Sequence, residues 1–87
     1  MFFIYVLRSQ RDSSLYIGLT NNLERRIRQH NSGHERTTRW RTPFTLLLAE
    51  SFQTRREARA RERYYKSGAG REALREAFWD VPGWRNW

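Results

Sequence analysis

The chain has 87 residues, of which 17 are basic and nine acidic, giving a formal net charge of +8. A chain of this length forms one domain and buries only about 60–65% of its unfolded surface, so its core is modest. The absence of cysteine excludes disulfides and a thiolate zinc site. It also fits a reducing cytoplasm, where we expect the protein to act.

The charge is carried almost entirely by arginine, because Lys66 is the only lysine in the sequence. Arginine presents a planar fork of donors that suits phosphate oxygens, whereas lysine offers a compact point charge. Such a surplus predicts nucleic acid or another polyanion as partner. An arginine-rich proteome with a solubilising surface is the alternative explanation. The apolar start of the chain ends at Arg8 and is too short to cross a bilayer, so we expect no membrane partner.

The first third of the chain predicts a β-hairpin followed by a helix. Residues 2–7 and 15–20 are rich in aromatic and β-branched side chains, and the polar segment 9–14 separates them. Asn21 or Asn22 can cap the helix, whose inward stripe at i, i+4 and i+7 ends at His30. The stripe begins with Leu23 and Ile27, and residues 31–33 end the helix.

A basic loop over residues 34–43 comes next. Its apolar residues follow neither a helical nor a strand spacing. We expect this loop to bind phosphates together with the arginines of the first hairpin. The predicted nucleic-acid-binding residues are Arg8, Arg11, Arg36, Arg39, Trp40 and Arg41. Residues 44–52 then alternate, with Phe44, Leu46 and Leu48 on one face. Both faces are largely apolar, which favours a central strand covered on at least one side.

The last third predicts two helices and a tail. Thr54 and Glu57 form a capping box that opens a helix over 55–66. Its inward stripe contains Ala58, Glu62 and Tyr65, while the arginines at 55, 56, 59 and 63 can point outward. A shorter helix is expected over 70–79. Residues 80–87 read as an irregular tail, whose tryptophans either cover the core or stack on unpaired bases.

The order is thus strand, strand, helix, strand, helix, helix. It predicts an α+β domain over residues 1–79 with a small, mostly antiparallel three-stranded sheet.

Several inward positions carry groups that can do chemistry. Tyr5 and Tyr16 can face each other across the hairpin, and Arg26 and His30 are neighbours on one helix face. An inward Glu62 needs an arginine or a cation, because burying an unpaired carboxylate is costly. Each residue alone has a plain structural explanation. Together they offer a phosphate ligand, proton-transfer groups and a carboxylate for a hard cation.

Four segments resemble the GIY-YIG endonuclease family along nearly the whole chain. Residues 3–5 resemble the GIY element and residues 15–18 the YIG element. Residues 22–33 are similar to the family's following helix, and residues 61–71 to its glutamate-bearing segment. The nearest resemblance is to short, free-standing bacterial members, which are themselves similar to the catalytic domain of the excision-repair nuclease. Four elements in the right order are a far more specific signal than any one of them.

The resemblance implies a role for each matching position. One tyrosine, Tyr5 rather than Tyr16, would help deprotonate the attacking water. Arg26 would steady the scissile phosphate, and His30 would relay or accept a proton. Glu62 would bind one divalent cation, Mg²⁺ or Mn²⁺, which would stabilise the leaving oxygen.

The match has three departures. Phe3 stands where the family motif has glycine, and Leu19 where some relatives carry lysine, so a lysine role cannot be transferred. No clear counterpart exists for an asparagine found late in larger members.

The sequence therefore predicts a metal-dependent DNA endonuclease with weak sequence selectivity, acting on double-stranded or branched DNA in repair or recombination. A larger repair complex is a further expected partner. A non-cleaving nucleic-acid-binding module of the same fold, or an interaction module within such a complex, remains the alternative. The sequence does not separate DNA from RNA.

Overall fold

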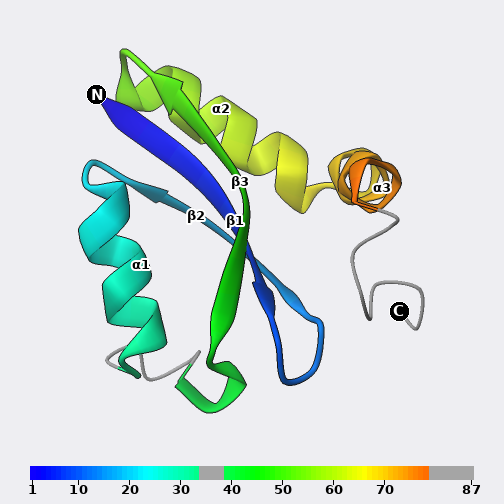
Figure 1. Cartoon of the computed structure of the whole chain (residues 1–87). Coiled ribbons are helices and arrows are strands. Elements are labelled where there is room, and N and C mark those ends of the chain that lie inside the picture. The colour runs from blue at the N-terminus through cyan, green and yellow to red at the C-terminus, as the bar shows by residue number, and fades with distance from the viewer. Residues whose placement is uncertain (34–38, 79–87) are drawn as a thin grey trace.

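The structure, a computed structural model, describes residues 1–33 and 39–78. It contains one sheet and three α-helices, arranged as an α+β fold in the predicted order (Figure 1). The fold class and the element order are therefore confirmed. In chain order the elements are β1 (Phe2–Ser9), β2 (Leu15–Thr20), α1 (Leu23–Asn31), the short 3-10 helix η1 (Arg39–Arg41), β3 (Phe44–Phe52), α2 (Arg55–Lys66) and α3 (Gly68–Ala77).

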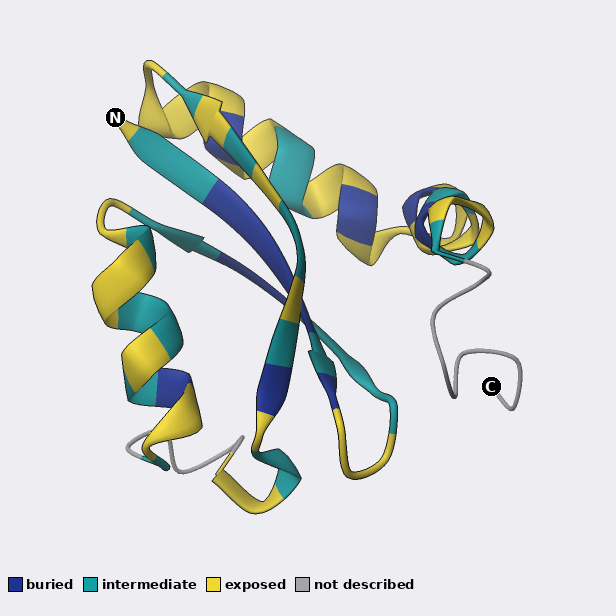
Figure 2. Cartoon of the chain, in the orientation of Figure 1, coloured by how far each residue is buried: buried dark blue, intermediate teal, exposed yellow. Residues whose placement is uncertain are grey.

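β1 is the central strand of the sheet, whose order is β2-β1-β3 with both pairings antiparallel. Four consecutive residues, Ile4 to Leu7, are buried, because helices cover both faces of this strand (Figure 2). Ile4 and Val6 pack in a cluster with Ala58 of α2 and Leu74 of α3. Tyr5 and Leu7 belong to a second cluster, against which α1 packs. The sheet thus separates α1 from the α2–α3 pair.

The expectation that residues 44–52 form the central strand is wrong, because β3 lies at an edge of the sheet. The strict alternation expected there is also interrupted. Val6 pairs with Leu48 but Leu7 pairs with Leu46, so the register shifts by one residue. Such a bulge changes the face to which the following side chains point. The apolar character of both sides of β3 reflects this change of face rather than a central position.

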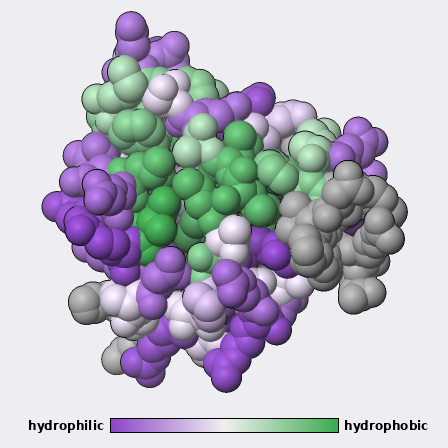
Figure 3. All heavy atoms as spheres, in the orientation of Figure 1, coloured by the Kyte–Doolittle hydropathy of each residue, from purple (hydrophilic) through white to green (hydrophobic). Residues whose placement is uncertain are grey.

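The side chains of β3 follow the bulge. Phe44 packs in the cluster near α1, whereas Leu47 and Leu48 pack on the α2–α3 side. Leu46, which was expected on the same face as Phe44, is 41% exposed, whereas Phe44 is buried. In the view of Figure 3 apolar residues gather over the middle of the sheet, with polar residues around them. A domain of this size cannot bury all of its apolar surface.

The helix boundaries follow capping residues. Asn22 caps α1 by accepting a hydrogen bond from the Arg25 N–H at 3.1 Å. The capping box between Thr54 and Glu57 is formed as predicted. α3 begins two residues earlier than predicted, because Ser67 both ends α2 and caps α3. The helix also ends earlier, at Ala77.

A polar cluster ties α2 to β3. Arg61 donates to Glu50 at 2.9 Å, and the Tyr65 hydroxyl donates to the same carboxylate at 3.1 Å. Burial raises the pKa of the Tyr65 phenol, and the hydrogen bond to Glu50 adds to that rise. Together with the buried Ala58 and Tyr65, the cluster helps to set the rotation of α2, and with it the side of the helix that Glu62 occupies.

Parts of the sequence-based expectations fall outside the described residues. These are the loop segment that contains Arg36, and residues 79–87 with the proposed tail. Among the described residues, no helix has both the length and the apolar character needed to cross a membrane.

Candidate active site

The candidate site is organised around the hydroxyl of Tyr5, a side chain that is 1% exposed. That oxygen lies 3.1 Å from His30 Nε2 and accepts a hydrogen bond from Arg26 Nε at 3.3 Å. Arg26 and His30 are one turn apart on α1, so a single helix face presents both groups to the tyrosine. A phenol oxygen that accepts from a guanidinium can still donate its own proton to an imidazole nitrogen.

Tyr16 joins this group from the neighbouring strand. Its ring centroid lies 6.2 Å from that of Tyr5 and 4.6 Å from that of His30. The two tyrosines share a face as expected, but they are diagonal neighbours. The residue directly opposite Tyr5 is Gly18, and Tyr16 pairs with Leu7.

Gly18 leaves room for the Tyr5 ring. A Cβ at this position would overlap the Tyr5 hydroxyl and lie 2.9 Å from its Cε1, closer than real Cβ atoms come. The glycine of the YIG-like element is therefore a packing requirement of the site. It lets the Tyr5 ring lie across β2 and reach His30 and Arg26.

Glu62 approaches from the opposite face of the sheet. Its helix, α2, packs on the side away from α1, yet Glu62 lines the same cleft as Tyr5, Tyr16 and Arg26. This cleft, of about 230 Å³, lies over β2 and is called the central cleft below. The Glu62 side chain is 12% exposed, as its place on the inward stripe predicts. The residues lining the central cleft are Tyr5, Tyr16, Ile17, Gly18, Leu19, Arg26, Arg55, Arg59, Glu62 and Lys66.

His30 takes a different place from the other four predicted site residues. It is fully buried and is not among the residues that line the cleft. It reaches the cleft through the two tyrosine rings and the Tyr5 hydroxyl. Such a position suits a group that accepts a proton from Tyr5 and excludes direct contact with a bulky substrate.

The charges around Glu62 are predominantly positive. Lys66 Nζ lies 3.3 Å and Arg59 Nη1 3.7 Å from its carboxylate oxygens. Arg26 and Arg55 also line the central cleft, so four basic side chains face one carboxylate. A positive cleft of this kind concentrates anionic substrates.

The donor set fits a single hard cation. Within the described part of the chain, no three His, Cys, Asp or Glu residues gather as a metal site. Mg²⁺ keeps several waters and is commonly held by one or two carboxylates together with substrate phosphates. The ion pairs with Lys66 and Arg59 involve side chains about half exposed, and such pairs contribute only about 0–1 kcal/mol. A cation at Glu62 would therefore displace them at little cost.

Several of the predicted nucleic-acid-binding residues gather at one end of the sheet. Arg11 donates to the Trp40 carbonyl at 2.9 Å, and Arg41 donates to Ser14 Oγ at 2.8 Å. The Arg41 guanidinium also lies 5.5 Å from the Trp40 ring centroid, and Trp40 is 57% exposed. Arg39, which is exposed, begins the same short helix.

Arg8 does not belong to that group by its strand position. It shares the alternation of Ile4 and Val6, which places it on the face covered by α2 and α3. The predicted binding surface is thus divided between the two faces of the sheet at this end. Arg36 lies outside the described residues.

Sequence reasoning missed three basic residues of the central cleft. Arg55 and Arg59 were expected to point outward, and Lys66 was given no role. A signal was present, because Arg55, Arg59, Glu62 and Lys66 recur at i, i+4, i+7 and i+11 along α2. Residues at that spacing share one side of a helix, so the side that carries Glu62 also carries these cations.

Comparison with known proteins identifies relatives of this chain. Residues 1–74 match the sequence model of the GIY-YIG catalytic domain. The chain is 48% identical over 67 residues to UPF0213 protein CPE1444 of Clostridium perfringens, covering 76% of this chain and 71% of that protein. It is 51% identical over 65 residues to UPF0213 protein BLi00048/BL00536 of Bacillus licheniformis, covering 74% and 66%.

A solved structure is also similar. The solution NMR structure of the UPF0213 protein BH0048 from Bacillus halodurans superposes with a TM-score of 0.55 at 34% identity. That match covers 88% of this chain and 85% of the other. The family match spans both tyrosines, Arg26, His30 and Glu62. This chain belongs to the GIY-YIG catalytic domain family, a family of nuclease domains.

Proposed function

We propose that the protein is a divalent-cation-dependent endonuclease that hydrolyses phosphodiester bonds in DNA. The observation that carries this proposal is the hydrogen-bonded group of Arg26, Tyr5 and His30, of which Arg26 and Tyr5 line the same cleft as Glu62. Phosphodiester hydrolysis needs a group that stabilises phosphate charge, a route for the proton of the attacking water, and a ligand for a hard cation. In this proposal Arg26, the Tyr5–His30 pair and Glu62 supply these three groups.

Arg26 has the geometry to bind the scissile phosphate. Its Nε is engaged by Tyr5 and one terminal nitrogen by Gln29 at 3.3 Å, which together orient the guanidinium. A guanidinium oriented in this way in the wall of the cleft can bind a phosphate without a large loss of side-chain entropy.

Tyr5 and His30 form the route for the proton. The Tyr5 hydroxyl can take a proton from a water in the cleft while passing its own to His30 Nε2 at 3.1 Å. The imidazolium formed would be buried, with the faces or edges of Tyr16 and Phe44 around it. Tyr16 thereby holds the His30 ring in place from the side of the cleft.

Glu62 would hold one divalent cation, Mg²⁺ or Mn²⁺, which would supply positive charge to the leaving oxygen. The protein would use phosphate contacts rather than base contacts, so we expect weak sequence selectivity and a preference set by DNA shape. We assign this activity to residues 1–79 and place it in cytoplasmic DNA repair or recombination, in a larger complex where one exists.

A second candidate function is a nucleic-acid-binding module that does not cut. The observation that favours it is the pairing of Glu62 with Lys66 and Arg59, which supplies the carboxylate with cations from the chain itself. Such a module would keep the positive cleft and lose only the metal-dependent step.

Incubation of the protein with labelled duplex, flapped and branched DNA distinguishes the two functions. The reactions would contain Mg²⁺, Mn²⁺ or EDTA, and the matching RNA strand would serve as a second substrate. The nuclease proposal predicts cleavage of DNA with either cation and none with EDTA. Binding without cleavage under every condition would contradict it and support the module.

A further inference from the structure

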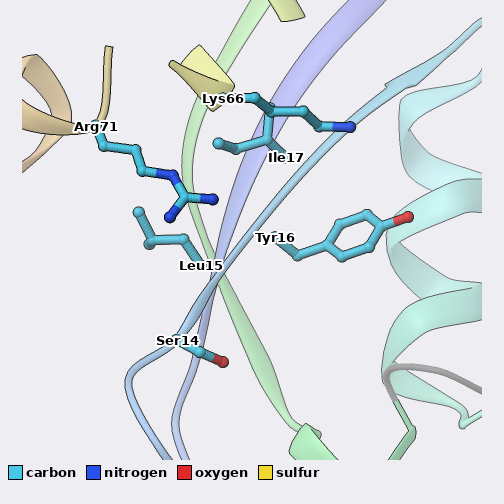
Figure 4. Close-up of a pocket in the computed structure, with 6 residues that line it drawn as sticks. All are labelled: Ser14, Leu15, Tyr16, Ile17, Lys66 and Arg71. Carbon is cyan, nitrogen blue, oxygen red and sulfur yellow. The ribbon is translucent and has the colours of Figure 1, made fainter. Parts of the chain in front are cut away.

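Two further clefts adjoin the central cleft along β2. The first, of about 380 Å³, is lined by residues 14–17 together with Lys66 and Arg71 (Figure 4). The second, of about 310 Å³, lies at the other end of the strand and includes Thr20, Arg25 and Arg55. We call them the Arg71 cleft and the Arg25 cleft.

The three clefts are neighbours, because each adjacent pair shares lining residues. Tyr16, Ile17 and Lys66 line both the Arg71 cleft and the central cleft. Leu19, Arg26 and Arg55 line both the Arg25 cleft and the central cleft. The three clefts therefore lie in a row along β2, with the candidate active site in the middle one, and we call this row the β2 groove.

Figure 4 shows how the Arg71 cleft is built. The Arg71 side chain points toward β2 on the side that carries Leu15 and Ile17, while Tyr16 is turned toward α1. Lys66 reaches over the same stretch of the strand. Tyr16 and Lys66 thus lie where the Arg71 cleft and the central cleft meet, since they line both.

Basic side chains are spread along the whole groove. They comprise Arg25, Arg26, Arg55, Arg59, Lys66 and Arg71. Glu62 is the single acidic side chain among the residues that line these three clefts. Arg71 is exposed and has no carboxylate within ion-pairing distance in the described part of the chain. A cation directed into a cleft with no internal partner is suited to an external anion.

We infer that the β2 groove binds one strand of nucleic acid, and that Arg71 and Lys66 form a phosphate subsite on one side of the cleavage position. Arg25 and Arg55 form the corresponding subsite on the other side. This inference rests on the proposed function, since it takes the central cleft as the cleavage position. It adds the path of the substrate strand along β2 and a phosphate subsite on each side of the cleavage position, for a strand running in either direction.

The length of the groove agrees with such a strand. The six residues of β2 span about 17 Å, at a rise of about 3.4 Å per residue in an antiparallel strand. One strand of duplex DNA advances about 3.4 Å along the helix axis per nucleotide, so the groove covers about five nucleotides. A single phosphate-containing metabolite would occupy only one of the three clefts and would leave the cations at the other end unused.

The groove also adjoins the group formed by Arg11, Trp40 and Arg41 at one end of the sheet, which we call the basic patch. Ser14 lines the Arg71 cleft and accepts the hydrogen bond from Arg41. The exposed Trp40 ring lies against that arginine, at the position where an unpaired base leaving the groove could stack. The patch is therefore an extension of the β2 groove rather than a separate binding surface.

The inference is tested by comparing arginines of equal charge inside and outside the groove. Arg55→Ala and Arg71→Ala remove groove cations, whereas Arg56→Ala and Arg63→Ala remove exposed arginines of α2 that line none of the three clefts. Binding to labelled duplex and single-stranded oligonucleotides of one sequence would be measured by fluorescence anisotropy, in EDTA, over a series of salt concentrations. Circular dichroism would confirm that all four variants are folded.

Each groove variant should lose about one phosphate contact. The slope of log K against log salt would then fall by about 0.9 on duplex and about 0.7 on single strands. Between 50 and 200 mM salt the affinity for duplex would therefore fall about three- to four-fold more for wild type than for the variant. The two control variants should keep the wild-type slope.

Equal slopes for Arg71→Ala and Arg63→Ala would overturn the inference, because the Arg71 cleft would then contribute no phosphate contact. Cleavage assays on the same variants keep the two proposals apart. A protein that cuts DNA while Arg71→Ala binds like wild type contradicts the groove and leaves the nuclease proposal standing. If the wild type never cleaves DNA but its binding depends on the groove arginines, the nuclease proposal is contradicted and the groove proposal stands.

Discussion

Replacing Gly18 by alanine should disturb the Tyr5 ring directly. The added Cβ would overlap the Tyr5 hydroxyl and lie 2.9 Å from Cε1, so the ring must move. Overpacking of this kind costs about 1–3 kcal/mol. In a domain of this size each kcal/mol lowers the melting temperature by about 4–8 °C, so we expect a fall of at least about 4 °C. A shift of the hydroxyl by about 1 Å from His30 would also reduce cleavage about 100-fold.

Gly68→Ala is the matched control for this prediction. Nothing lies within 4 Å of a Cβ built at Gly68, which is the first residue of α3. Alanine there should raise stability by about 0.4–1 kcal/mol and leave cleavage unchanged. Thermal unfolding by circular dichroism and cleavage rates would be measured on both variants. A Gly18→Ala protein with the wild-type melting temperature and rate would refute the packing argument for the YIG-like glycine.

Three further changes test other parts of the structure. Thr54→Ala removes the capping box of α2 and should cost about 0.5–2 kcal/mol in urea unfolding, and a change below about 0.3 kcal/mol would contradict the cap. Gly70→Ala places a Cβ against the Tyr64 carbonyl, so it should destabilise the protein more than Gly68→Ala; equal melting temperatures would refute this. The pKa of Tyr65 is raised above 10.0, so its contribution to stability is intact below pH 10.0 and lost as the pH rises further. The free energy of unfolding of Tyr65→Phe should therefore fall less above that pH than that of wild type. Parallel plots of unfolding free energy against pH for the two proteins would contradict the raised pKa.

The element order could be predicted because local signals agreed with the fold. The capping box at Thr54, the polar break between the two hairpin strands and the i, i+4, i+7 stripe ending at His30 are all determined by nearby residues. The pairing of Arg26 and His30 on one face of α1 followed from helix geometry alone. These features depend on neighbours within one or two turns, which a sequence displays directly.

The features that sequence did not predict depend on contacts between distant segments. The edge position of β3 and the bulge opposite Val6 and Leu7 arise from pairing between strands about forty residues apart. Apolar residues on both faces of β3 suggested a buried strand, but a change of face at the bulge produces the same pattern. Arg55 and Arg59 are exposed, as expected, and their place beside Glu62 in the central cleft was missed although their spacing along α2 indicates it.

The site itself was predicted in composition but not in arrangement. Sequence placed Tyr5, Tyr16 and Glu62 on inward positions, and the resemblance assigned their chemistry. It could not show that Glu62 and the tyrosines lie on opposite faces of the sheet and meet over β2. An edge strand with Gly18 opposite Tyr5 makes that meeting possible, since the Tyr5 ring occupies the space a side chain would fill.

The central claim is that Glu62 holds the divalent cation required for cleavage, and Glu62→Gln tests it most directly. The substitution keeps the shape of the side chain and removes its charge. Glu72→Gln, at an exposed carboxylate of α3 that lines none of the clefts, is the matched control. Both variants would be compared with wild type for Mn²⁺ binding by titration calorimetry, DNA binding in EDTA, melting temperature and cleavage rate. Our account predicts that Glu62→Gln loses Mn²⁺ binding and cleavage while keeping fold and DNA binding, and that Glu72→Gln matches wild type. Cleavage by Glu62→Gln at the wild-type rate in Mg²⁺ or Mn²⁺ would contradict it.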